Sequence, residues 1–258
     1  MINDEKAVAR REIGLIDLTE LGDKATATDV TKLCARAVGT VAAVCVWPRH
    51  VALAASLLKA TGVRIATVVN FPFGDDSIED VVTLARQSLA DGADEIDLVL
   101  PYRALLAGDH ARPAAMVAAV RRAVPSGDGS RLKVILETGE LKRPATIRAA
   151  AELAIRNGAD FIKTSTGKTR VSATLAATEL MLHAIRDLDP AVGLKPSGGI
   201  RTLAEASDYL QQADRIMGPT WVSPATFRFG ASGLLDALEL VVTRETAGKA
   251  VRTEGVGY

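Results

Sequence analysis

Two lysines occupy positions from which an amine could act as a nucleophile. Lys163 ends the apolar run 159–162, and Lys195 ends the apolar run 192–194. Burying an ammonium ion is costly, so a lysine at the end of a buried strand shifts toward its neutral form. A second cation on a neighbouring strand lowers the pKa of at least one of the two amines further. The pair therefore predicts an enzyme that forms an imine with a carbonyl substrate.

Other charged residues interrupt apolar runs in the same way. Asp17 and Asp97 each break an aliphatic stretch, and Lys133 lies in the run 131–138. Lys133 and Glu137 share a face of that run because their spacing of four is even. Inward-pointing polar side chains near the carboxyl ends of barrel strands form the active site. The sequence thus predicts lysines and carboxylates together at one end of the fold.

These charged residues have two interpretations, catalysis and packing. For Lys163, Asp97 and Lys195 together, catalysis is favoured because three ionisable groups at three strand ends rarely serve packing alone. For the other charged residues of these runs, a buried ion pair that holds the barrel in register is an equally good interpretation.

The elements that must position these residues follow a regular alternation. Runs expected to form strands are 15–19, 41–46, 64–70, 94–100, 131–138, 160–164, 192–195 and 215–217. Stretches expected to form helices are 27–38, 48–61, 78–91, 113–124, 144–157, 173–188 and 203–211. Successive strands start roughly 23 to 37 residues apart, the spacing of βα units. The pattern and the length of 258 residues predict an α/β fold, a closed (β/α)8 TIM barrel.

A doubly wound open sheet is the competing architecture. It is disfavoured because no Gly-x-Gly-x-x-Gly sequence follows the first expected strand and no change of pattern marks a second domain. We expect residues 1–243 to form a single domain. The pattern fades beyond it, so residues 244–258 are expected to form a flexible tail.

The overall composition is that of a soluble cytoplasmic enzyme. Lys plus Arg and Asp plus Glu number 31 each, so no net charge is available to attract nucleic acid or an acidic membrane. The charged N-terminus lacks the apolar stretch of a signal peptide. The only cysteines are Cys34 and Cys45, which does not imply a disulfide framework. Three isolated histidines make a zinc site unlikely, and no metal is expected.

Two glycine-rich segments, 196–201 and 228–233, have the composition of a phosphate site. The first follows the seventh expected strand, and the second follows the eighth and opens a helix. Glycine lets backbone amides approach an anion, and a helix N-terminus adds partial positive charge. The corresponding loops of TIM barrels commonly bind a substrate phosphate. Arg201 and Lys168 lie nearby in the sequence and strengthen this interpretation.

Nine segments follow one another in the order found in a known family, namely 16–19, 43–49, 64–72, 92–97, 101–105, 132–141, 158–168, 193–199 and 228–232. From about residue 14 to 240 the chain resembles the deoxyribose-phosphate aldolases. The two lysine-bearing segments are the most specific part of the likeness.

The resemblance implies a class I aldolase, a lyase of deoxyribonucleotide and carbohydrate catabolism. Such an enzyme reversibly cleaves 2-deoxy-D-ribose 5-phosphate to D-glyceraldehyde 3-phosphate and acetaldehyde through a lysine Schiff base. The resemblance implies no metal, no organic cofactor and a homo-oligomer, either a dimer or a tetramer. Lys163 matches the Schiff-base lysine, and Asp97 and Lys195 match the residues that transfer protons. Asp17 and Lys133 match supporting polar residues at the barrel mouth.

The same resemblance assigns the phosphate-binding positions. They are Gly167, Lys168, Gly198, Gly199, Arg201, Gly230 and Ser232, with Tyr258 as the C-terminal tyrosine that can reach the site. Gly233 stands where many relatives have a serine, which removes one hydroxyl near the phosphate. Two alternatives stay open: another Schiff-base barrel enzyme, such as a transaldolase or dehydratase, and a phosphosugar-binding barrel without catalysis.

Overall fold

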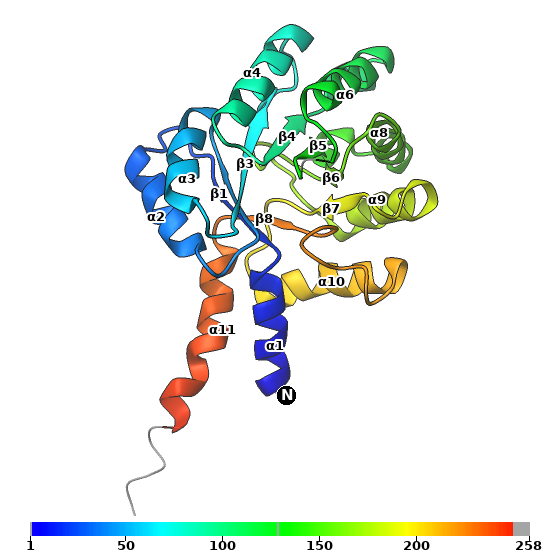
Figure 1. The fold of residues 1–258 in the computed structure, drawn as a ribbon. Helices are drawn as coiled ribbons and strands as arrows, with labels where there is room; N and C mark the ends of the chain where they lie inside the picture. Colours follow the sequence, from blue (N-terminus) through cyan, green and yellow to red (C-terminus); the bar gives the residue numbers. More distant parts are fainter. Residues whose placement is uncertain (1, 128, 250–258) are drawn as a thin grey trace, which may run out of the picture.

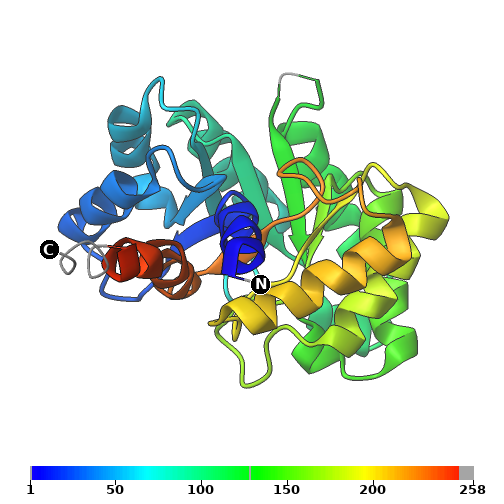
Figure 2. The ribbon, with the colours of Figure 1, turned by 90° about the horizontal axis from the view of Figure 1, so that it is seen from below.

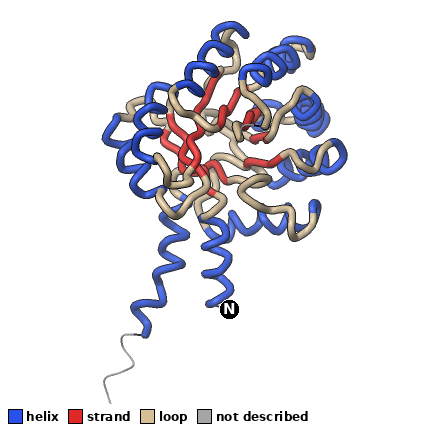
Figure 3. The backbone as a smooth tube through the Cα atoms, in the orientation of Figure 1, coloured by secondary structure: helices blue, strands red, loops and turns tan. Residues whose placement is uncertain are grey.

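The computed structural model describes residues 2–127 and 129–249. Within them, eight parallel strands form one sheet in the order β7-β6-β5-β4-β3-β2-β1-β8. The strands are β1 (Ile16–Glu20), β2 (Ala43–Val46), β3 (Arg64–Val69), β4 (Glu95–Val99), β5 (Arg131–Ile135), β6 (Phe161–Lys163), β7 (Gly193–Lys195) and β8 (Phe229–Ala231). The strands form the inner layer of the molecule, and the helices surround them (Figures 1 and 3).

Backbone contacts between β7 and β8 close the sheet into a barrel. The Leu194 amide donates to the Thr226 carbonyl at 2.8 Å, and the Arg228 amide donates to the Leu194 carbonyl at 3.0 Å. Parallel bridges also join Leu194 to Phe227 and Ser197 to Gly230. The expected closed (β/α)8 barrel is therefore confirmed.

The helices are α1 (Ile2–Ile13), α2 (Ala27–Ala37), α3 (Val51–Leu58), α4 (Ile78–Ala90), α5 (Tyr102–Leu106), α6 (Ala111–Ala123), α7 (Thr138–Leu141), α8 (Pro144–Arg156), α9 (Leu175–Leu188), α10 (Leu203–Met217) and α11 (Leu234–Lys249), with a 3₁₀ turn, η1 (Pro48–His50), before α3. Ser77 caps α4, and Thr202 forms a capping box with Glu205 at the start of α10. Such caps satisfy amides that a helix leaves without intrahelical partners.

The eighth strand lies later than the sequence predicted. Residues 215–217 form the last turn of α10, and β8 is Phe229–Ala231. The prediction was wrong because three apolar or basic residues at the end of an amphipathic helix cannot be told from a short strand by composition. The glycine-rich segment 228–233 therefore contains β8 and does not follow it.

The fifth strand ends earlier than predicted. It stops at Ile135, and Glu137 adopts a left-handed backbone conformation with φ of 57° before α7 begins. Lys133 and Glu137 consequently do not share a strand face. The structure also contains α1, α5 and α7, which the sequence did not predict. Helix α1 lies alongside α11 in both views of the molecule (Figures 1 and 2).

The barrel interior is divided into an apolar and a charged part. Cys45, Ala66 and Val68 from β2 and β3 pack with Leu21 in a small buried apolar cluster. The charged side chains come from β1, from β4 to β7 and from the residue before β8. Both cysteines are free and buried. In the part of the chain that the structure describes, no helix is long and apolar enough to cross a membrane.

Candidate active site

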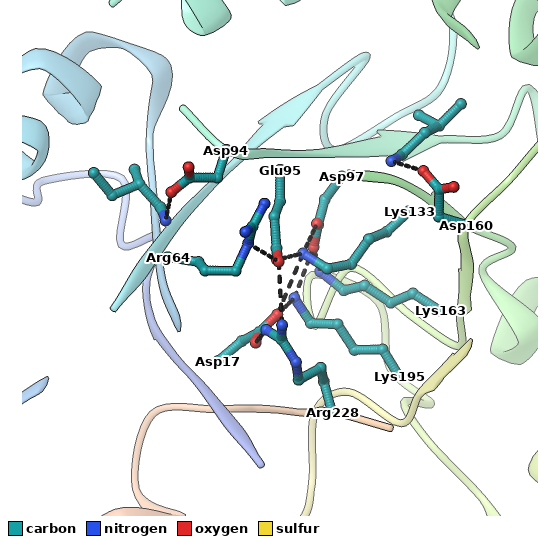
Figure 4. A network of polar contacts seen from close by, with 12 residues as sticks. Asp17, Arg64, Asp94, Glu95, Asp97, Lys133, Asp160, Lys163, Lys195 and Arg228 are labelled. Carbon is teal, nitrogen blue, oxygen red and sulfur yellow. Dashed lines mark hydrogen bonds and ion pairs between the residues drawn. The ribbon is translucent and has the colours of Figure 1, made fainter. Parts of the chain in front are cut away.

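Charged side chains from several strands meet inside the barrel (Figure 4). At most 4% of each is exposed, and they are Asp17, Glu95, Asp97, Lys133, Lys163, Lys195 and Arg228. Strand register explains the meeting, because Asp97 aligns with Lys133 across β4 and β5, and Lys163 aligns with Lys195 across β6 and β7. The structure thus brings together all five residues that the sequence analysis nominated for catalysis.

Asp97 is the carboxylate that connects the three lysines. Its Oδ1 accepts from Lys133 Nζ at 2.9 Å. Its Oδ2 accepts from Lys163 Nζ at 2.9 Å and from Lys195 Nζ at 2.8 Å. Burial disfavours the charged carboxylate, but the three ammonium groups outweigh burial and hold the pKa of Asp97 well below its ordinary value. Asp97 is therefore ionised and in contact with both candidate lysines.

The surroundings of Lys163 and Lys195 push their pKa values in opposite directions. Burial lowers the pKa of Lys163, and the attraction of Asp97 is not enough to restore it because Lys195 repels the charge. Burial also opposes the charge of Lys195, but Asp17 and Asp97 outweigh it and raise the pKa of that amine. Lys195 Nζ lies 2.6 Å from Asp17 Oδ2, a contact that Lys163 lacks among the described residues. Lys163 is thus the amine that loses its proton more readily.

Two members of this network, Glu95 and Arg228, were missed by the sequence analysis. Glu95 contacts Lys133, and its Oε1 accepts from Arg64 Nε at 2.8 Å and from an Arg228 nitrogen at 3.2 Å. Arg228 also donates to Asp17 Oδ1 at 2.6 Å. Glu95 could have been found, because it lies two residues before Asp97 and so shares its face of the strand. Arg228 gave no signal, because the eighth strand had been placed elsewhere.

A cavity of about 860 Å3 opens at the carboxyl ends of β1, β6, β7 and β8. Its lining includes all the glycine, lysine, arginine and serine positions expected to bind phosphate, namely Gly167, Lys168, Gly198, Gly199, Arg201, Gly230 and Ser232. Arg170 and Ser172 line it as well and were not expected. The remaining expected position, Tyr258, lies outside the described residues.

Two of these glycines are required by close contacts. Gly198 has φ of 81°, and a Cβ atom there would lie 2.6 Å from Ser172 Oγ. A Cβ atom at Gly230 would lie 2.3 Å from Ser197 Oγ and 3.1 Å from Lys195 Cε. Glycine at position 230 thus leaves room for the Lys195 side chain as well as open backbone at the cavity.

Lys168 lies across the mouth of the cavity. Its Nζ is 2.8 Å from Asp23 Oδ1, so an ion pair joins the loop after β6 to the loop after β1. Asp23 is 87% exposed, and such pairs are weak and screened by salt. The lysine can therefore exchange this partner for another anion at little cost.

Glu137 holds the loop that carries Lys168. Its Oε2 accepts from the amide and hydroxyl of Thr166 at 3.2 and 2.5 Å, and its Oε1 accepts from the Thr169 hydroxyl at 3.1 Å. Burial raises the pKa of Glu137 despite these hydrogen bonds. The side chain is thus an anchor for the loop. Among the described residues, no group of three or more His, Cys, Asp or Glu residues could hold a metal ion.

A family model decides the assignment of the chain. Residues 12–238 match the model described as "DeoC/LacD family aldolase". The chain belongs to this family. It is therefore an aldolase, a type of lyase. A deoxyribose-phosphate aldolase from Agrobacterium fabrum is 53% identical over 235 residues, which cover 90% of each chain.

Solved structures agree with the family. A crystal structure from Toxoplasma gondii ME49, provisionally assigned as a deoxyribose-phosphate aldolase, has a TM-score of 0.87 and 27% identity, covering 96% of this chain and 99% of that one. A deoxyribose phosphate aldolase from Aeropyrum pernix, described as having a unique tetrameric structure, has a TM-score of 0.74 and 25% identity, covering 94% of this chain and 98% of that one.

Proposed function

We propose that the chain is a deoxyribose-phosphate aldolase that reversibly cleaves 2-deoxy-D-ribose 5-phosphate to D-glyceraldehyde 3-phosphate and acetaldehyde. The observation that carries the proposal is the position of Lys163. This amine is buried, contacts one carboxylate among the residues that the structure describes, and has a lowered pKa. Lys163 ends β6, and the loop after β6 supplies Gly167 and Lys168 to the cavity lining. The activity of the relative from Agrobacterium fabrum supports the choice of substrate.

In the first step the neutral amine of Lys163 attacks C1 of the open-chain sugar aldehyde. A lysine at its reference pKa of about 10.4 would be neutral in fewer than roughly one molecule in a thousand at pH 7, so the lowered pKa matters. The resulting carbinolamine loses its hydroxyl, which takes up a proton and leaves as water, and a protonated imine remains. Lys195 carries the proton to be donated, and Asp97 contacts both nitrogens and can pass a proton between them.

The second step breaks the bond between C2 and C3, because acetaldehyde contains two carbons. The electron pair of this bond moves into the protonated imine and gives a neutral enamine. The C3 hydroxyl loses its proton and becomes the aldehyde of D-glyceraldehyde 3-phosphate. Protonation of the enamine at C2 and addition of water then release acetaldehyde and regenerate Lys163. One water is released and one is consumed, so the cycle balances.

The cavity beside this site is proposed to hold the 5-phosphate. Lys168 and Arg201 supply positive charge, and the glycines at 167, 198, 199 and 230, together with Ser232, supply backbone and hydroxyl donors. Lys133 and Asp17 are proposed to keep Lys195 and Asp97 in place through their ion pairs. Tyr258 is proposed to reach the mouth from the tail.

Further properties are part of the same proposal. Residues 1–243 act as a single domain. The expected tail, 244–258, begins inside α11, which runs to Lys249, so its first six residues are helical. The enzyme works in the cytoplasm through a Schiff base, with no metal or organic cofactor and without nucleic acid or a membrane as partner. It assembles as a homo-oligomer, a dimer or tetramer, and the tetramer described for Aeropyrum pernix supports this.

Borohydride trapping tests chemistry and site together. Acetaldehyde and borohydride should attach a two-carbon adduct to Lys163, which peptide mass spectrometry locates. Lys163→Met should abolish both the adduct and release of D-glyceraldehyde 3-phosphate in a coupled assay. An adduct on another lysine would overturn the assignment. Activity on ketose phosphates alone would indicate a transaldolase-like enzyme, and binding of deoxyribose 5-phosphate without cleavage would indicate a phosphosugar-binding barrel.

A further inference from the structure

Arg228 joins the buried network through Asp17 and Glu95. It lies immediately before β8 and is 4% exposed. Its guanidinium donates to Asp17 Oδ1 at 2.6 Å and to Glu95 Oε1 at 3.2 Å. Neither contact involves Asp97. Arg228 therefore occupies the two carboxylates of the network that Lys163 does not contact (Figure 4).

The buried network contains more cations than carboxylates. Four buried cations, Lys133, Lys163, Lys195 and Arg228, face the three carboxylates Asp17, Glu95 and Asp97. Arg64 also contacts Glu95, but its side chain is 32% exposed. If every group were ionised, the buried set would carry excess positive charge. Excess charge in a region shielded from water is removed most easily by releasing a proton.

The number of carboxylate partners decides which amine releases that proton. Among the described residues, Lys133 contacts all three carboxylates. Lys195 contacts Asp17 and Asp97, and Lys163 contacts only Asp97. An arginine keeps its proton in proteins. Lys163 is thus the least stabilised cation of the four.

We propose that Arg228 is a positioning residue that keeps Lys163 uncharged, because its fixed positive charge occupies Asp17 and Glu95 and leaves Asp97 as the one carboxylate available to Lys163. The inference rests on the proposed function, in which Lys163 must be neutral to form the imine. Arg228 acts through Asp17, whose second oxygen holds Lys195 at 2.6 Å. Lys195 in turn repels a charge on Lys163.

Without Arg228 the excess positive charge of the buried network disappears. Asp17 and Glu95 would lose a permanent cation, and the buried charges would then be three lysines against three carboxylates. The network could keep all three lysines protonated without excess charge. Asp97, Lys195, Cys45 and Glu137 act on Lys163 directly. Glu137 is left out of the count of carboxylates because burial raises its pKa and so favours its neutral form. The pKa of the Cys45 thiol is raised by burial, so this group stays neutral and does not compensate.

The test is the pH dependence of borohydride trapping of acetaldehyde on Lys163, with the adduct located by mass spectrometry. Four proteins form a cycle: wild type, Arg228→Gln, Glu95→Gln and the double variant. Arg228→Gln should raise the midpoint of the pH profile by on the order of one unit, and Glu95→Gln should lower it. The double variant removes one cation and one carboxylate, so its midpoint should return toward that of the wild type. Arg228→Lys, which keeps the charge, should stay close to the wild type.

The controls separate this inference from the proposed function and from folding. Arg148 is an exposed residue of α8 that forms ion pairs with Glu152 and Asp187. Arg148→Gln removes this positive charge and should leave the midpoint of trapping unchanged. If Arg228→Gln does not fold, the comparison of Glu95→Gln with the double variant still measures the effect of Arg228. Equal midpoints for the wild type and Arg228→Gln, or for Glu95→Gln and the double variant, overturn the inference and leave the proposed function intact. Failure of wild-type Lys163 to form any adduct overturns the proposed function itself.

Discussion

Replacing Lys195 with methionine tests the electrostatic basis of the mechanism most directly. Lys163 and Lys195 both donate to Asp97 Oδ2, at 2.9 and 2.8 Å. Two donors to one carboxylate oxygen lie roughly 4–5 Å apart. At an effective dielectric constant of about 20, two unit charges at that distance repel by about 3–4 kcal/mol. This energy corresponds to about two to three pKa units.

The direction of the effect follows from the charge that is removed. Without the Lys195 cation, the protonated form of Lys163 is repelled less, and Asp97 attracts it more, so the pKa of Lys163 rises. The neutral fraction at pH 7 then falls by about 100- to 1000-fold. Imine formation should be slow at neutral pH in Lys195→Met and should recover as the pH rises by about two to three units.

The assay is single-turnover trapping of acetaldehyde with borohydride across a range of pH. Lys168→Met is the matched control, because it removes a lysine at the mouth of the cavity that lies outside the buried network. It should raise KM for the phosphorylated substrate without moving the midpoint of trapping. A midpoint in Lys195→Met equal to or lower than that of the wild type would refute the argument that Lys195 depresses the pKa of Lys163.

Three further predictions concern the loop after β6, strand β8 and helix α1. Glu137→Gln should weaken the anchoring of Thr166 and so raise KM for deoxyribose 5-phosphate several-fold, while kcat/KM for unphosphorylated deoxyribose stays within about twofold. Gly230→Ala should destabilise the fold by about 1–3 kcal/mol in urea denaturation, because the added methyl group would overlap Ser197; unchanged stability would contradict the close contact. Burial raises the pKa of Glu12 to about 7, so folding favours its protonated form and the wild type loses stability as the pH rises from about 4.5 to about 7. Glu12→Gln should remove this loss. Its free energy of unfolding relative to that of the wild type should therefore be higher at pH 8 than at pH 4.5, by up to about 3 kcal/mol. Equal pH dependence of unfolding in the two proteins would contradict this prediction.

The sequence was sufficient to predict the barrel and five of the seven charged residues that meet inside it. Lys163, Asp97 and Lys195 each interrupt or end an apolar run, and such a placement in a parallel barrel directs polar side chains to one end. The glycine-rich segments could also be recognised in the sequence, because their chemistry depends on the local backbone and not on distant contacts. These predictions needed only local composition and the alternation of strands and helices.

The remaining features depend on contacts between distant segments. Strand β8 has three residues, one of them glycine, and is a strand only because β1 and β7 flank it. Arg228 acquires its partners Asp17 and Glu95 through this closure. Glu137 ends the fifth strand by adopting a left-handed conformation that its residue type does not favour. A single sequence gives no local sign of any of these features.

The junction between β7 and β8 links substrate binding to the stability of the fold. Strands β7 and β8 meet through isolated bridges, whereas the other neighbouring strands form continuous ladders. The loops that follow these two strands also line the proposed phosphate site. A phosphate held by both loops would join the sheet where its strands are linked by isolated bridges and not by a continuous ladder. Ligand binding would then stabilise the closed barrel, and the free energy of unfolding should grow with the logarithm of ligand concentration.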